Sequence, residues 1–131
     1  MRIKTAAALL AILTMLATAG PASAGSDEDQ VRIVLDGMNG SYNRSDFAGF
    51  ASHVCADMLS ANGYEAGWYA SRKTDGPTRI IVNSVNVKGN NAVANVKFEA
   101  ANRTDDKTLD MEFLRVGADW KACRFDTGQY I

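Results

Sequence analysis

The chain has 131 residues, with 14 Lys and Arg against 15 Asp and Glu and a single His, so its net charge is -1 at neutral pH. This balance excludes the basic excess that binds phosphate backbones, and nucleic acid is therefore not an expected partner. Hydrophobic residues make up 47% and charged residues 22%, which is the composition of one globular domain and not of a disordered chain.

The first 24 residues are predicted to be a secretory signal peptide. Arg2 and Lys4 precede a short apolar run that extends to Leu16, and the segment ends in the small residues Ala22-Ser23-Ala24. A membrane anchor is less favoured, because the run is shorter than the ~20 apolar residues of a spanning helix. We therefore expect a secreted or cell-envelope protein, cleaved after Ala24, with residues 25–131 forming a single domain without stable membrane insertion.

A first helix is predicted to begin after Ser26. This residue has the side chain of a helix N-cap, and three acidic residues follow it, where they oppose the helix dipole. Apolar residues then recur at helical spacing and form one stripe: Val31, Val34, Leu35, Met38 and Tyr42.

A second helix is predicted from Asp46 to about Asn62. Its apolar stripe contains Phe47, Phe50, Ala51, Val54, Cys55, Met58 and Leu59. The sulfur of Cys55 should therefore face the core. His53 and Asp57 fall on the opposite side, which predicts an exposed pair.

Residues 64 to 77 are compatible with a third short helix or an irregular segment, and strands follow from Thr78. Residues 79–87 are rich in β-branched side chains, and a hairpin turn at 88–91 leads to a second strand. The next strands alternate cleanly between two faces. The predicted inward residues are Ala94, Val96 and Phe98, then Leu109, Met111 and Phe113, and finally Cys123 and Phe125.

Helices followed by an antiparallel meander predict an α+β domain, in which N-terminal helices pack on one face of the sheet. Cys55 and Cys123 are the two cysteines of the chain. In an oxidising compartment such a pair is expected to form a structural disulfide, although two buried free thiols are the alternative. Two Cys and one His do not make a zinc site, and no metal or cofactor is expected.

Three segments resemble the nuclear transport factor 2-like superfamily, which has a cone-shaped, cystatin-like fold. They are Tyr42-Asn43-Arg44-Ser45-Asp46-Phe47, residues 85–94, and residues 113–121 with their Gly-Asp-Trp-Lys-type turn. The resemblance is closest to small exported actinobacterial members of unassigned function, and it covers residues 30 to 126. It implies a curved sheet that wraps the helices and a pocket at the wide end. Some members use this pocket for isomerisation, dehydration or hydrolysis, and others for binding or dimerisation.

Candidate pocket-lining residues follow from the inward faces and from the aromatic segment after the second helix. They are Tyr64, Trp68, Tyr69, Phe98, Met111, Phe113 and Arg115. Strict alternation places Arg115 on the core face, but we favour a bulge between Phe113 and Leu114. Such a bulge would turn Leu114 and Val116 inward and leave Arg115 in solvent.

No catalytic residue is assigned from the sequence. His53 and Asp57 could form a base and its orienting carboxylate, but an exposed pair on a helix surface is favoured. The favoured function is an exported binding or interaction domain without catalytic activity, which holds a small apolar ligand, binds a protein partner or dimerises through its sheet. The alternatives are a pocket enzyme of isomerase, dehydratase or hydrolase type, and a secreted enzyme inhibitor with residues 63–70 as its wedge.

Overall fold

The computed structural model describes residues 25–125, which form four helices followed by four strands. The helices are α2 (Asp27–Asn43), α3 (Phe47–Ala51), α4 (Ala56–Leu59) and α5 (Tyr64–Asp75), and the strands are β1 (Thr78–Lys88), β2 (Asn91–Ala100), β3 (Lys107–Val116) and β4 (Asp119–Phe125). The predicted signal peptide and residues 126–131 lie outside the described residues.

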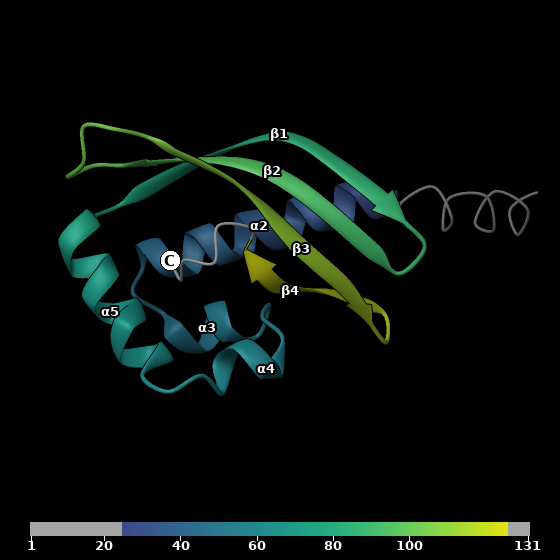
Figure 1. Ribbon diagram of the computed structural model, residues 1–131, viewed down its shortest axis with the longest axis horizontal. Coiled ribbons are helices and arrows are strands. Elements are labelled where there is room, and N and C mark those ends of the chain that lie inside the picture. The colour runs from purple at the N-terminus through teal and green to yellow at the C-terminus, as the bar shows by residue number, and fades with distance from the viewer. Residues whose placement is uncertain (1–24, 126–131) are drawn as a thin grey trace, which may run out of the picture.

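The four strands form one curved antiparallel sheet in the order β1-β2-β3-β4. Helix α2 crosses the inner side of this sheet, and α3, α4 and α5 lie beyond α2, with α5 at one end (Figure 1). The α+β class and the helices-on-one-face arrangement predicted from the sequence are therefore confirmed.

Helix α2 begins as its sequence predicts. The Ser26 hydroxyl accepts a hydrogen bond from the Asp29 backbone N–H at 3.1 Å, and three acidic residues occupy the first turn. The buried side of the helix consists of Val31, Leu35, Met38, Ser41 and Tyr42. It packs against the inward residues of the sheet, where Ala92, Ala94, Val96, Leu109, Met111 and Phe113 are all buried.

The predicted second helix is not continuous. Helix α3 ends at Ala51 and α4 begins at Ala56, and the segment between them runs beside β4, where Val54 forms a parallel bridge with Ala122. The Ala122 N–H donates to the His53 carbonyl at 2.8 Å, and the Cys55 N–H donates to the Ala122 carbonyl at 2.8 Å. These bonds satisfy part of the edge of β4, and this gain outweighs the helical preference of the segment.

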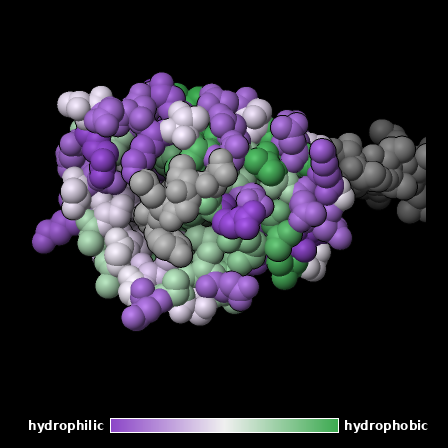
Figure 2. All heavy atoms as spheres, viewed as in Figure 1, coloured by the Kyte–Doolittle hydropathy of each residue, from purple (hydrophilic) through white to green (hydrophobic). Residues whose placement is uncertain are grey.

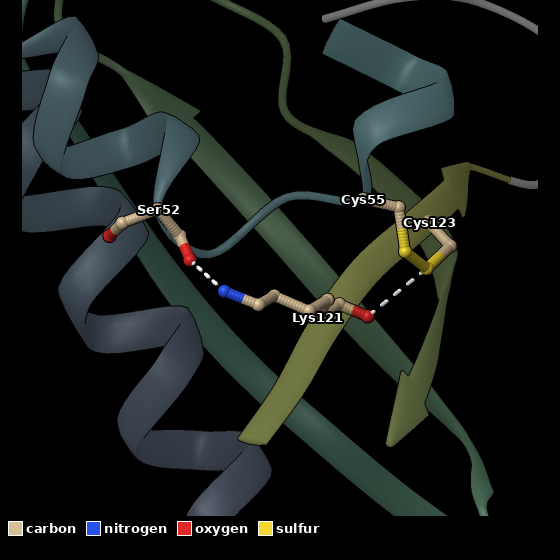
Figure 3. Close-up of a disulfide and its surroundings, with 4 residues drawn as sticks. All are labelled: Ser52, Cys55, Lys121 and Cys123. Carbon is tan, nitrogen blue, oxygen red and sulfur yellow. Dashed lines mark hydrogen bonds between the residues drawn. A yellow bond between two sulfur atoms is a disulfide. The ribbon is translucent and has the colours of Figure 1, made fainter. Parts of the chain in front are cut away.

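A disulfide joins Cys55 to Cys123, with Cα atoms 4.9 Å apart (Figure 3). The predicted pairing is therefore present, but its surroundings differ from the prediction, because both cysteines are only half-buried. Lys121 donates from Nζ to the Ser52 carbonyl beside it. The disulfide and these hydrogen bonds fasten segment 52–55 to the edge of the sheet.

A bulge occurs in the β3–β4 pairing, but not where we predicted it. Glu112 pairs with Arg124 and Phe113 pairs with Ala122, so Cys123 is the extra residue. This places Trp120, Ala122 and Phe125 on the buried face of β4. The alternation of β3 continues without a flip, and Leu114 (43% exposed) and Val116 (52% exposed) face outward.

Figure 2 shows polar residues mainly over the upper part of this face, and apolar residues along its lower part and towards the hairpin ends. The outer face of the sheet carries the ion pairs Arg79–Glu99, Lys97–Glu99 and Arg124–Glu112. Among residues 25–125, none of the helices is long and apolar enough to cross a membrane.

Candidate functional site

A cavity of about 680 Å³ lies between α2, α5 and the inner side of the sheet. This volume falls within the ~300–1,000 Å³ of typical small-molecule sites. Most of its wall is apolar, and the side chains that form this part include Leu35, Met38, Trp68, Ile80, Phe98, Leu109, Met111 and Phe125. The cavity is therefore a place where a mainly apolar molecule could leave water.

Local periodicity explains how this wall is assembled. Leu35, Met38 and Tyr42 lie three and four residues apart on α2 and therefore share one side of the helix. Leu109 and Met111 are two residues apart on β3 and point to the same side of the sheet. The helix stripe and the sheet face meet around the cavity.

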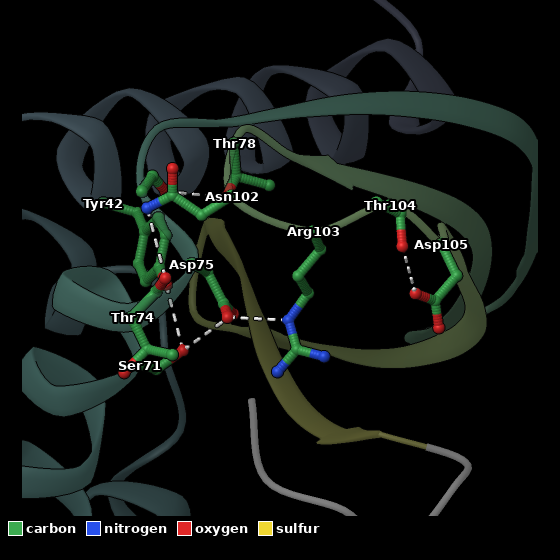
Figure 4. A network of polar contacts seen from close by, with 10 residues as sticks. Tyr42, Ser71, Thr74, Asp75, Thr78, Asn102, Arg103, Thr104 and Asp105 are labelled. Atoms are coloured by element: carbon green, nitrogen blue, oxygen red, sulfur yellow. Dashed lines mark hydrogen bonds and ion pairs between the residues drawn. The ribbon is translucent and has the colours of Figure 1, made fainter.

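Four polar side chains form a connected group on the cavity wall, which we call the mouth network: Tyr42, Ser71, Asp75 and Arg103 (Figure 4). The Tyr42 hydroxyl lies 2.9 Å from the Ser71 hydroxyl, and Ser71 donates to Asp75 Oδ2 at 3.4 Å. Arg103 donates from Nε to Asp75 Oδ1 at 2.7 Å. Asp75 is thus the centre of the network.

The direction of the protons in the network follows from its acceptor. An ionised carboxylate only accepts hydrogen bonds, so the Ser71 proton points to Asp75 and Tyr42 donates to Ser71. Burial raises the pKa of Tyr42, an effect opposed by the Ser71 hydrogen bond and reinforced by the charge of Asp75. Tyr42 therefore remains a neutral phenol whose proton is engaged with Ser71.

Backbone contacts hold Arg103 beside Asp75. Asn102 donates from its backbone N–H to the Asp75 carbonyl at 2.9 Å and from Nδ2 to the Thr74 carbonyl at 3.2 Å. Gly76, with φ of 75°, turns the chain from α5 into β1, and a Cβ there would lie 2.8 Å from the Asn102 amide. The β2–β3 loop is therefore fixed against the end of α5.

The charges at the cavity mouth balance. Four charged residues line the cavity: Asp75 and Asp105 are acidic, and Arg103 and Lys107 are basic. The hydrogen bond to Asp75, and then the charge of Asp75, raise the pKa of Arg103, so its guanidinium stays cationic. The mouth is polar but carries no net charge.

An aromatic cluster around Trp68 supports the helical side of the cavity. The Trp68 ring is 5.4 Å from Tyr42, 5.2 Å from Phe47 and 5.3 Å from Phe50, measured between ring centres. Its Nε1 has no hydrogen-bond partner within residues 25–125. Burial raises the pKa of Tyr64, on the same helix, to about 12, so this phenol is neutral at ordinary pH.

Four of the seven candidate lining residues reach the cavity, namely Tyr64, Trp68, Phe98 and Met111. The other three do not line it. Tyr69 is 43% exposed on the outer side of α5, and Phe113 is packed in the core away from the cavity. Arg115 instead contacts Asp27 and Trp120. It lies on the inner side of the sheet, as strict alternation predicts, so the favoured bulge that would leave it in solvent is wrong.

The structure also corrects the interpretation of His53 and of residues 63–70. His53 is half-buried against α2, where a Cβ on Gly37 would lie 2.8 Å from its Nε2, and it does not line the cavity. The prediction of exposure relied on a continuous helix, which is interrupted here. Residues 64–70 form the first part of α5, and Tyr64 and Trp68 are buried, so these two aromatic side chains are not free to insert into a partner enzyme.

The mouth network is not predicted from the sequence, because its members are far apart in the chain. One signal was available. A tight turn at 89–90 sets the hairpin register, in which Thr78 pairs with Ala100. Residues just before 78 and just after 100 must then be neighbours, which brings Asp75 to Arg103.

Within residues 25–125, no three His, Cys, Asp or Glu side chains are placed to hold a metal ion together. No protein-family model and no curated protein sequence matches the chain.

Solved structures do resemble it. A nuclear transport factor 2-like protein of unknown function from Shewanella oneidensis superposes with a TM-score of 0.56 at 14% identity, covering 72% of this chain and 92% of the other. A candidate dehydratase of the same family from Streptomyces avermitilis gives 0.55 at 14% identity, covering 73% and 90%. A candidate hydroxylase from Streptomyces galilaeus gives 0.55 at 12% identity, covering 74% and 79%. At these identities the likeness shows the fold and does not assign an activity.

Proposed function

We propose that this chain, which has the nuclear transport factor 2-like fold, is an exported binding protein that holds a small, mainly apolar molecule in its cone. The observation that carries this proposal is the cavity of about 680 Å³, with its apolar wall and its polar mouth. A pocket that combines much apolar surface with a few fixed polar groups is typical of small-molecule sites. The disulfide and the signal-type N-terminus are compatible with export.

The hydrogen bonding of the mouth supports binding over catalysis. Asp75 accepts from Arg103 with one oxygen and from Ser71 with the other, and Tyr42 gives its proton to Ser71. A general base or acid needs a free lone pair or a free proton directed at the substrate. In this network the Tyr42 and Ser71 protons are both used internally, and each oxygen of Asp75 already accepts one hydrogen bond.

Gly67 offers a direct test of the proposal. It lies on α5 and lines the cavity, and a Cβ added there meets nothing within 4 Å. We expect the uncharged dye N-phenylnaphthylamine to bind the protein with increased fluorescence, and Gly67→Phe to weaken this binding by about tenfold or more, because the ring occupies the ligand space.

Ala66→Phe is the matched control, because Ala66 is next to Gly67 and is exposed like it, but does not line the cavity. It should leave dye binding unchanged. Equal binding by both variants would refute the cavity as the ligand site.

A pocket enzyme is the second candidate function, and the position of Asp75 favours it. This carboxylate lines the cavity and is held in one orientation by Arg103 and Ser71, as a catalytic carboxylate would be. A screen of ester, epoxide and hydroxyketone substrates tests this candidate. Turnover that is lost in Asp75→Asn while dye binding persists would favour the enzyme over the binding protein.

A further inference from the structure

We propose that the ligand of the cone is an uncharged molecule with a carbonyl-type oxygen, which Arg103 binds at the mouth while the apolar remainder lies in the cavity. This inference rests on the proposed binding function and specifies the chemical class of the ligand. It depends on three features of the mouth: free donors, an engaged phenol and balanced charge.

The first feature is the set of hydrogen-bond donors that Arg103 still offers. Its guanidinium carries five N–H donors, and the bond from Nε to Asp75 at 2.7 Å uses one of them. Figure 4 marks an interaction between Nε and the Asp75 carboxylate, and none between the two terminal nitrogens and the residues drawn. Arg103 lines the cavity, so these nitrogens can donate to an oxygen of a molecule bound there.

The second feature is that no other side chain of the mouth network offers a proton. Ser71 donates to Asp75, and Tyr42 donates to Ser71. Burial, the first cause of the raised Tyr42 pKa, keeps the phenol from ionising. The group that the network presents to a ligand is therefore the Arg103 guanidinium, and its complement is a hydrogen-bond acceptor.

The third feature is the net charge of the mouth, which decides whether a neutral or an anionic acceptor is favoured. Asp75 neutralises Arg103 at contact distance, and Asp105 and Lys107, from the β2–β3 loop and the start of β3, add one formal charge of each sign to the lining. A carboxylate ligand would lose its hydration and approach a pair with no net positive charge, with two aspartates near it. A ketone, aldehyde or ester oxygen pays a much smaller desolvation cost and still accepts from Arg103.

Three probes with similar chains separate these possibilities: decane, methyl octyl ketone and decanoate. Trp68 lies in the cavity wall and is 1% exposed, so its fluorescence, together with titration calorimetry, reports occupancy. We expect the ketone to bind more tightly than decanoate. Arg103→Met should weaken the ketone by about tenfold or more and leave decane unchanged, because it removes one charge-assisted hydrogen bond.

Asp75→Asn should shift the selectivity of the cavity towards the anionic probe. It leaves Arg103 without its neutralising partner, so decanoate should gain about tenfold in affinity while the ketone changes little. Arg124→Met is the matched control, because Arg124 forms a similar pair with Glu112 on the outer face of the sheet. It should alter none of the three affinities.

The outcomes distinguish this inference from the proposed function. If decane and ketone bind and respond equally to Arg103→Met, or if decanoate binds the unaltered protein most tightly, the inference is overturned and the binding function stands. If none of the three probes binds, the binding function fails, and the inference with it. Circular dichroism of each variant verifies that it is folded.

Discussion

Arg115 lies over Trp120, its cross-strand partner, with its Cζ atom 4.5 Å from the ring centre. The same guanidinium contacts Asp27 at 2.6 Å, in the first turn of α2. One side chain therefore joins β3, β4 and the beginning of α2, at a place outside the cavity. Its function in the molecule is structural.

We expect Arg115→Met to lower the free energy of unfolding by about 1–2 kcal/mol, because it removes a cation–π contact and a partly shielded ion pair. Urea denaturation measures the change. Arg124→Met, which removes a more exposed pair on the outer sheet face, should cost less than ~0.5 kcal/mol. A change in ligand affinity on replacing Arg115 would contradict its position outside the cavity.

The disulfide should account for a large share of the stability. It closes a loop of 68 residues between Cys55 and Cys123, for which chain entropy gives an upper figure of roughly 4 kcal/mol. We expect the double variant Cys55→Ser, Cys123→Ser to lose up to this amount in urea denaturation. Titration of the denatured, unreduced protein should detect no free thiol, and two thiols per chain would show that the bridge does not form in the exported protein.

Export and cleavage form a separate prediction. The Ala22-Ser23-Ala24 site should yield an exported protein that begins at Gly25. Mass spectrometry of the protein recovered outside the cytoplasm measures its N-terminal residue. Recovery of a chain that retains Arg2 and Lys4 in the membrane fraction would contradict cleavage.

Local patterns predicted the elements whose structure is decided locally. The alternation in β2 and β3 identified Ala94, Val96, Leu109 and Met111 as inward residues, and all four are buried. The acidic first turn and the cap at Ser26 identified the start of α2. Side-chain spacing sufficed here because each element buries one face.

The same approach failed where a distant segment decides the conformation. Nothing near Val54 indicates that Ala122 needs a partner on the edge of β4, so the apolar spacing predicted a continuous helix. The mouth network has the same origin, because Asp75 and Arg103 meet only after the hairpin register is set. Interactions between such distant residues depend on topology, which a periodic pattern does not contain.

Gly63 and Gly67 lie on either side of the start of α5, and both have room for a side chain. They differ in backbone conformation. A Cβ at Gly67 or at Gly63 meets nothing within 4 Å, but Gly63 has a φ of 76°. We expect Gly67→Ala to raise the free energy of unfolding by about 0.5–1 kcal/mol, because alanine is the better helix former. Gly63→Ala should instead lower it by about 1 kcal/mol, because the left-handed conformation strains alanine. Thermal and urea denaturation compare the stability of the two variants. Equal changes in the free energy of unfolding would contradict the difference in backbone conformation between Gly63 and Gly67.

His53 should make the stability depend on pH near neutrality. Burial first, and then the charge of Lys121, lower the pKa of His53 from its ordinary value of 6.5, and the opposing charge of Asp119 does not restore it. Between the folded-state pKa and 6.5 the unfolded chain binds more protons than the folded one, so the free energy of unfolding rises with pH across this window. The contribution is complete above 6.5 and is lost as the pH falls through the window.

Urea denaturation at about pH 7.5 and about pH 5 measures this dependence. The unaltered protein should lose more stability on acidification than His53→Gln, because glutamine does not titrate. Asp57→Asn is a suitable control, since Asp57 is exposed and forms no ion pair within the described residues. Equal losses for the unaltered protein and His53→Gln would show that the imidazole is as freely protonated in the fold as in the unfolded chain, which would contradict its packing against α2 at Gly37.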